Sequence, residues 1–189
     1  MKTEFECRFV DIDVDDIRAR LAAAGFACVH PEHLLRRKIF MLPDLDGAQR
    51  WLRLRDEGDK TTLTLKLKSD ISNGASAMKE IECIVDDFST MGELLESSGL
   101  ECSAYEENRR EKWTRGNVEA CIDTWPGLDA FLEVEASDED ALRSAVAELG
   151  LDYRDAMFGN VTEVYGKKLG LTLDEIHASC TFANPPKKR

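Results

Sequence analysis

The sequence predicts an α+β fold in which antiparallel strands close into a barrel with a polar interior and helices packed outside. First, several strand-like segments carry charges on alternate residues, such as Glu4, Glu6 and Arg8, or Arg53 and Arg55. Residues two apart share one face of a strand, so each segment has a charged face and an apolar face. Second, helical segments separate the strands and can cover the apolar outer faces.

The first half of the chain shows clear boundary signals. Its predicted elements are a strand at 4–10, a helix at 13–24, a strand at 36–40, a hairpin of 50–55 and 61–68, a strand at 79–85 and a helix at 89–98. Aspartates in the first turn and Gly25 at the end bound the first helix. Pro31 is placed in a loop, and Glu57-Gly58-Asp59 is typical of a turn. The polar segment Ser69–Ser76 is expected to be a mobile loop.

The second half repeats the alternation of strands and helices. Its predicted elements are a hairpin of 104–113 and 118–123, a strand at 130–136, a helix at 138–149, a helical segment at 158–169 and a turn at 174–179. We expect Ser137 to cap the helix at 138–149 and Gly150 to end it. No internal linker rich in Pro, Gly or Ser is present. Residues 1–170 are therefore expected to form one domain, followed by a partly disordered C-terminal extension at 171–189.

Composition narrows the class of protein. The net charge of −12 argues against a general nucleic-acid binder, which needs a broad basic face, but a small anionic ligand needs only a local positive field. No apolar run approaches the roughly 20 residues that span a bilayer, and no secretory pattern begins the chain. The six cysteines have no regular spacing, which argues against a disulfide framework or zinc site. We expect a cytoplasmic protein that binds neither nucleic acid nor membrane.

The acidic and basic strands together indicate a site for a metal ion and a phosphate ligand. Carboxylates that share one face repel each other, and a divalent cation such as Mg²⁺ or Mn²⁺ relieves that repulsion. Arginine matches phosphate oxygens with a planar fork, and lysine adds a compact charge. Acids that hold a metal opposite bases that hold phosphate are typical of phosphoryl-transfer sites. The alternative is a sheet whose charges face solvent and pair across strands.

A series of short motifs follows in order along most of residues 1–170. The motifs are Glu4-Phe-Glu-Cys-Arg8, Trp51-Leu-Arg-Leu-Arg55, Leu63-Thr-Leu-Lys66, Lys79-Glu-Ile-Glu82, Arg110-Glu-Lys-Trp113, Ile122-Asp123 and Phe131-Leu-Glu-Val-Glu135. The first resembles an ExExK signature, and the ordered set resembles the CYTH superfamily, the triphosphate tunnel metalloenzymes. This resemblance implies an antiparallel eight-stranded barrel that forms a tunnel, with helices outside.

The resemblance also implies a role for each charged position. The residues that it implies as ligands of Mg²⁺ or Mn²⁺ are Glu4, Glu6, Glu133, Glu135 and Asp123, assisted by Glu80 or Glu82. The residues that it implies as clamps on the triphosphate are Arg53, Arg55, Lys66, Lys68, Arg110 and Lys112. Catalytic roles are implied for Arg8, Arg110 and Asp123.

By the same resemblance, the chain is expected to be a metal-dependent enzyme that acts on a triphosphate. The expected type is a class IV adenylyl cyclase, which converts ATP to cyclic AMP and pyrophosphate. One alternative is a triphosphatase for inorganic or thiamine triphosphate, and another is a non-catalytic module that binds polyphosphate or a nucleotide. Two departures favour the last reading: Arg8 replaces the family lysine, and Asn108 replaces a lysine two residues before Arg110. A homodimer, a common state of compact enzymes, stays open.

Overall fold

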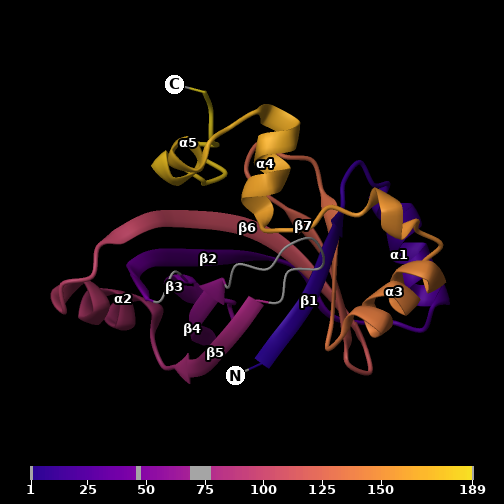
Figure 1. Ribbon diagram of the computed structural model, residues 1–189, viewed down its shortest axis with the longest axis horizontal. Coiled ribbons are helices and arrows are strands. Elements are labelled where there is room, and N and C mark those ends of the chain that lie inside the picture. The colour runs from indigo at the N-terminus through magenta and orange to yellow at the C-terminus, as the bar shows by residue number, and fades with distance from the viewer. Residues whose placement is uncertain (1, 46–47, 69–77, 189) are drawn as a thin grey trace.

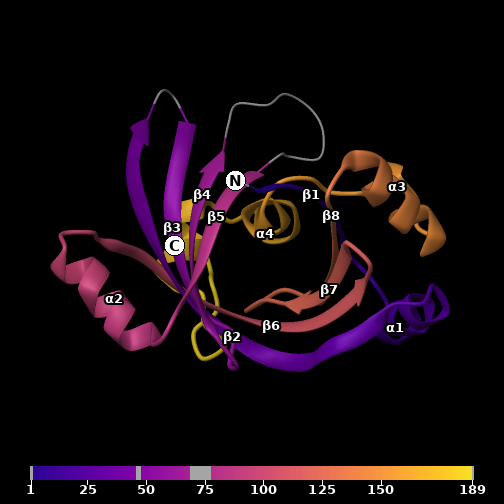
Figure 2. The ribbon, with the colours of Figure 1, turned by 90° about the horizontal axis from the view of Figure 1, so that it is seen from below.

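The first strand of the chain closes the sheet into a ring. β1 (Lys2–Phe9) pairs antiparallel with β5 (Met78–Val85) on one side and with β8 (Phe131–Ala136) on the other. The computed structural model describes residues 2–45, 48–68 and 78–188, and the side chains of 5–44, 49–67 and 79–188. Within these residues the order around the barrel is β1-β5-β4-β3-β2-β6-β7-β8, as Figure 2 shows. This confirms the predicted α+β fold with a closed, antiparallel, eight-stranded barrel.

The remaining strands include one that is longer than the sequence predicted. They are β2 (Ala27–Leu45), β3 (Ala48–Asp56), β4 (Thr61–Lys68), β6 (Cys102–Arg115) and β7 (Val118–Thr124). The loop expected around Pro31 was wrong, because β2 runs through it. Pro31 lies at a register shift between His30 and His33, where β2 pairs with β6 alone. A proline is tolerated at such an irregularity because its missing N–H interrupts no regular ladder.

The helices lie outside the strands. They are α1 (Val14–Ala23), α2 (Phe88–Ser97), α3 (Glu139–Glu148), α4 (Val161–Leu169) and α5 (Leu173–Ala178), with a 3₁₀ turn at Tyr153–Asp155. Figure 1 shows α1 and α3 together at one end of the molecule and α2 at the other. Two expectations need correction. Asp138, not Ser137, caps α3, and the turn expected at 174–179 is the short helix α5.

The main apolar core lies between the ring and its helices rather than inside the ring. Cys7 and Phe9 of β1 and Val134 of β8 pack there against Leu21 of α1 and Leu142 of α3. These strand residues alternate with charged residues whose side chains point the other way. Because the helices cover the apolar faces, the inner faces of the strands are free to carry charge.

Helices α4 and α5 cover one opening of the ring. Figure 2 shows α4 behind the ring of strands, and Figure 1 shows both helices above β6 and β7. Tyr165 of α4 is fully buried, and its hydroxyl donates to the carbonyl of Pro126 at 2.7 Å. Leu171, Ile176 and Cys180 join the same apolar cluster. The division of the chain at residue 170 stays a prediction.

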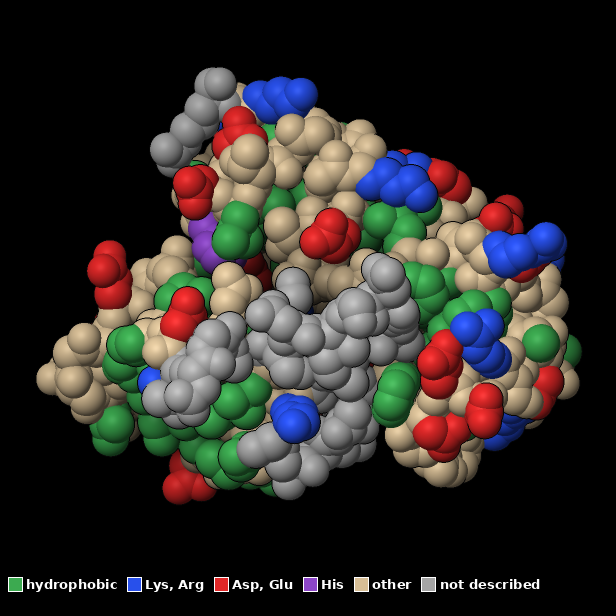
Figure 3. Space-filling model, viewed as in Figure 1, with side chains coloured by type: hydrophobic (Ala, Val, Ile, Leu, Met, Phe, Trp, Pro, Cys, Tyr) green, Lys and Arg blue, Asp and Glu red, His purple; other side chains and the backbone are tan. Residues whose placement is uncertain are grey.

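Two further points concern the chain as a whole. The segment Ser69–Ser76, expected to be a mobile loop, falls outside the described residues. Within the residues that the structure describes, no helix is long and apolar enough to cross a membrane. Figure 3 shows acidic and basic side chains interspersed over the described part of one face, without a broad basic patch.

Candidate functional site

The ring encloses a cavity of about 420 Å³ that is lined from all eight strands and from α4 and α5. Every predicted site residue whose side chain the structure describes lines this cavity. These residues are Glu6, Arg8, Arg53, Arg55, Lys66, Glu80, Glu82, Arg110, Lys112, Asp123, Glu133 and Glu135. The side chains of Glu4 and Lys68 fall outside the described ones. The i, i+2 spacing of the charges therefore placed them on the inner face of the barrel.

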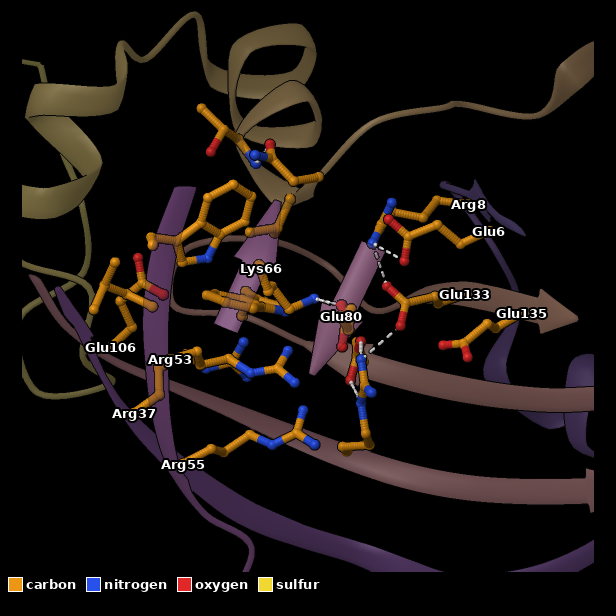
Figure 4. Close-up of a pocket in the computed structure, with 18 of the residues that line it drawn as sticks. Glu6, Arg8, Arg37, Arg53, Arg55, Lys66, Glu80, Glu106, Glu133 and Glu135 are labelled. Atoms are coloured by element: carbon orange, nitrogen blue, oxygen red, sulfur yellow. Dashed lines mark hydrogen bonds and ion pairs between the residues drawn. The ribbon is translucent and has the colours of Figure 1, made fainter. Parts of the chain in front are cut away.

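One side of the cavity is acidic, formed by β1 and β8. Figure 4 shows Glu6, Glu133 and Glu135 reaching in from this side together with Arg8. The Arg8 Nη2 atom lies 3.1 Å from Glu6 Oε2 and 2.5 Å from Glu133 Oε2. Its Nη1 atom donates to the carbonyl of Gly159, just before α4. Burial raises the pKa of Glu6 despite the opposing charge of Arg8.

Arg110 of β6 links the acidic side to β7. Its Nε and Nη2 atoms donate to the two carboxylate oxygens of Asp123 at 2.8 and 2.5 Å, and Nη2 also donates to Glu133 at 2.8 Å. Burial opposes ionisation of Glu133, but Arg8 and Arg110 outweigh it and lower its pKa. Asp123 also accepts from the amide of Asn108 at 3.1 Å. Glu133 is therefore a carboxylate at neutral pH, held by two arginines.

The opposite side of the cavity is basic, formed by β3 and β4. Figure 4 shows Arg53 and Arg55 extending from β3 toward the centre, with Lys66 paired to Glu80. Arg55 is held by Glu57, which accepts from its Nε and Nη2 atoms at 2.9 and 2.6 Å. Burial, and then the charge of Arg55, lower the pKa of Arg53 to about 10. Each cation of this wall therefore has a carboxylate within 4 Å, and Arg53 has the longest of these contacts.

Arg53 has few partners of its own. Its Nη2 atom lies 3.8 Å from Glu82 Oε2, beyond hydrogen-bond reach, and 3.4 Å from the hydroxyl of Thr64. That hydroxyl accepts from Arg53 and in turn donates to Glu82 at 2.8 Å. Lys112, by contrast, is engaged with Glu119 at 2.5 Å. The structure thus brings the predicted basic residues to one cavity, but leaves them in different states of pairing.

Comparison with models of protein families identifies the family of this chain. The model of the CYTH domain matches residues 2–162. The chain belongs to the CYTH domain family. No curated protein matches its sequence.

Solved structures share the CYTH fold of this chain. A protein of Vibrio parahaemolyticus, provisionally named an adenylate cyclase, is 14% identical with a TM-score of 0.68, covering 87% of this chain and 98% of that one. A protein of Pyrococcus horikoshii OT3 is 20% identical with a TM-score of 0.67, covering 82% and 94%. A provisionally named adenylyl cyclase from Hippeastrum, described as having a dominant triphosphatase activity, is 18% identical with a TM-score of 0.52, covering 92% and 98%. At these identities the likeness concerns the fold alone.

The acidic side of this CYTH domain has suitable donors for a divalent metal ion. Mg²⁺ and Mn²⁺ prefer carboxylate oxygens, and Glu6, Glu133 and Glu135 supply them from two neighbouring strands. Among the described side chains, no three potential ligands yet stand close enough to form a metal site. Arg8 instead contacts both Glu6 and Glu133. The carboxylate donors therefore fit the divalent metal ion that the family implies. In this structure the guanidinium of Arg8 is the cation that contacts them.

Two basic residues of the cavity were not predicted from the sequence: Arg37 of β2 and Lys60 in the turn between β3 and β4. Arg37 of β2 is 7% exposed and lines the cavity beside the predicted arginines. It stands between Arg36 and Lys38, and three consecutive basic residues give no indication of which face each one takes. In the structure Arg37 shares its strand face with Ile39 and Met41, which also line the cavity.

Proposed function

We propose that this CYTH domain is a metal-dependent enzyme that acts on a triphosphate, of the class IV adenylyl cyclase type. The observation that carries the proposal is the separation of charge across the cavity. Its lining contains nine carboxylates and eight lysines or arginines, so the whole is close to neutral. Because Glu6, Glu133 and Glu135 reach in from one side and Arg53 and Arg55 from the other, the cavity can accept a cation and an anion together (Figure 4). A metal–triphosphate complex has this polarity.

In this proposal, separate sets of residues bind the phosphate groups and the metal ion. Arg53, Arg55 and Lys66 bind the phosphate oxygens, for which a guanidinium offers paired donors. Glu6, Glu133 and Glu135 would hold the metal ion, which when bound neutralises phosphate charge and orients the reacting group. The hydrogen bonds of Arg110 to Asp123 and Glu133 hold these two carboxylates of β7 and β8 in a fixed relation.

The apolar part of the lining favours a nucleotide as the substrate. Ile39 and Met41 of β2 and Trp51 of β3 line the cavity beside Arg53. Apolar and aromatic side chains suit an organic group rather than a bare triphosphate. For ATP, the resulting reaction is attack of the ribose 3′-hydroxyl on the α-phosphate, with loss of pyrophosphate.

Hydrolysis of a triphosphate is the second candidate function. The Hippeastrum protein that shares the fold is described as having a dominant triphosphatase activity. The same phosphate-binding and acidic walls serve either reaction, since only the attacking group differs.

Product analysis tests the proposal. Purified protein is incubated with Mg²⁺ or Mn²⁺ and, separately, with ATP, inorganic triphosphate and thiamine triphosphate. Cyclic AMP and pyrophosphate from ATP identify a cyclase, and orthophosphate without a cyclic product identifies a triphosphatase. We expect Glu133→Gln to abolish turnover and Glu139→Gln, on the exposed surface of α3, to leave it unchanged. Tight binding without turnover would instead support a non-catalytic module. The absence of both binding and turnover would refute the proposal.

A further inference from the structure

Arg37 is a buried cation that forms no ion pair within 4 Å among the described residues, although Glu106 lies opposite it on β6. Its guanidinium lies over the ring of Trp125, with Cζ 4.6 Å from the ring centroid, and its Nη2 donates to Asn108 Oδ1. The buried Nε atom has no hydrogen-bond partner. Burial lowers its pKa to about 9; the charge of Glu106 opposes this shift, and the charges of Arg55, Arg53 and Arg110 add to it. The group thus stays charged at neutral pH in unfavourable surroundings.

Its neighbours hold Arg37 at the end of the cavity that α4 covers. Trp125 packs edge-on against Tyr165 of α4, with ring centroids 6.5 Å apart. Asn108 accepts from Arg37 and donates to Asp123 at 3.1 Å, so both ends of its amide are used. The neutral amide fixes the position of the guanidinium without cancelling its charge.

Burying a charge without a close ion pair is costly, and a strongly perturbed ionisable group that lines a cavity is a candidate for binding a ligand. Arg37 is aimed into the same cavity as Arg53 and Arg55 and retains unused donors. An arginine that served packing alone would need no charge, because an apolar side chain could fill the space against Trp125.

We infer that Arg37 is a substrate-binding residue that donates to a phosphate oxygen of the bound triphosphate, and that Asn108 and Trp125 position it. This inference rests on the proposed function and deepens it. It extends the phosphate-binding wall from β3 and β4 to β2, toward the end of the cavity covered by α4.

Binding of inorganic triphosphate to Arg37→Met, measured by calorimetry in EDTA, tests the inference without interference from turnover. Methionine keeps the length of the side chain and removes its charge. The matched control is Arg36→Met, because Arg36 is the adjacent residue of β2, about half exposed and paired with Asp56 on the outside. We expect the dissociation constant to rise at least about tenfold for Arg37→Met and to stay within about twofold for Arg36→Met.

Thermal unfolding of the ligand-free proteins gives a second readout. Removing a buried charge that lacks a close ion pair is expected to raise the melting temperature of Arg37→Met, whereas losing a purely structural arginine would lower it. Arg37→Lys, which keeps the charge, is expected to bind with intermediate affinity and guards against misfolding of the methionine variant.

The outcomes separate the inference from the proposed function. The inference alone is overturned if the wild-type protein and Arg37→Met bind inorganic triphosphate equally well. It is also overturned if both methionine variants lose the same amount of affinity. Failure of the wild-type protein to bind inorganic triphosphate in EDTA overturns the inference, whereas the proposed function is overturned only if product analysis with Mg²⁺ or Mn²⁺ finds neither binding nor turnover of any triphosphate.

Discussion

Arg8 occupies the position between two carboxylates where the sequence leads us to expect a metal ion. Its contacts with Glu6 and Glu133 neutralise part of the acidic wall, and its bond to Gly159 anchors the guanidinium near α4. A metal ion that binds these carboxylates competes with an internal cation. The replacement of the family lysine by Arg8 is thus expected to alter metal affinity.

Arg8→Lys tests this competition. Lysine keeps the charge but offers a single ammonium group, which cannot contact Glu6, Glu133 and Gly159 together as the fork does. We expect Mn²⁺ to bind several-fold more tightly, as measured by titration calorimetry. Arg18→Lys, which alters an ion pair with Glu111 outside the cavity, serves as the control. Unchanged or weaker Mn²⁺ binding by Arg8→Lys would contradict the role given to Arg8.

Glu57 gives a pH-dependent contribution to stability. Burial opposes its ionisation, but Arg55, Lys60 and the hydroxyl of Thr62 outweigh it and lower its pKa to about 2. The pKa in the folded state lies below that in the unfolded state. The stabilisation is therefore present above about pH 4.5 and lost as the pH falls through 2.

Glu57→Gln is expected to lower the free energy of unfolding at pH 7 by about 1–3 kcal/mol. Urea unfolding at pH 7, 5 and 3.5 measures this, and the difference from the wild-type protein should shrink at the lowest pH. Glu139→Gln, which breaks an exposed pair with Arg143, should change stability by less than about 0.5 kcal/mol. A Glu57 effect that did not vary with pH would argue against ionic stabilisation.

At the scale of elements, the start of α3 shows how a neighbouring polar residue can mislead a sequence-based assignment. Both Ser137 and Asp138 are good N-cap residues. In the structure the Asp138 side chain accepts from the backbone N–H of Ala141 at 2.8 Å, while the Ser137 hydroxyl donates to Asp138 at 3.1 Å. The choice depends on where the preceding strand ends, which propensity does not specify.

Asp138→Ala and Ser137→Ala form a matched pair for this helix. We expect Asp138→Ala to lower the free energy of unfolding by about 1 kcal/mol, because it leaves an N–H of α3 without its acceptor. Ser137→Ala should cost less than half of that. Chemical denaturation of both variants measures the difference, and equal losses would mean that the two residues share the cap.

At the scale of the whole molecule, the sequence indicated the barrel because charge alternates along its strands. The same alternation predicted many of the charged side chains that line the cavity, but it did not mark Arg37, Glu57, Lys60, Glu106 or Glu119. Arg37 sits among consecutive basic residues, and Pro31 concealed the length of β2. The covering of one opening by α4 and α5 depends on packing between distant segments, such as Tyr165 on Pro126, which no local pattern encodes. The roles of the metal-binding and catalytic residues stay predictions.

The double pairing of β1 also bears on how the chain reaches its native state. β1 joins β8 across a long separation in sequence, since Arg8 and Glu133 are 125 residues apart. Contacts of this kind require the closure of a large loop, and proteins rich in them fold slowly. Until β8 pairs, both β1 and β8 present an open edge to other chains. The strand that completes the tunnel thus makes aggregation a competing outcome during folding, one that is removed when the ring closes.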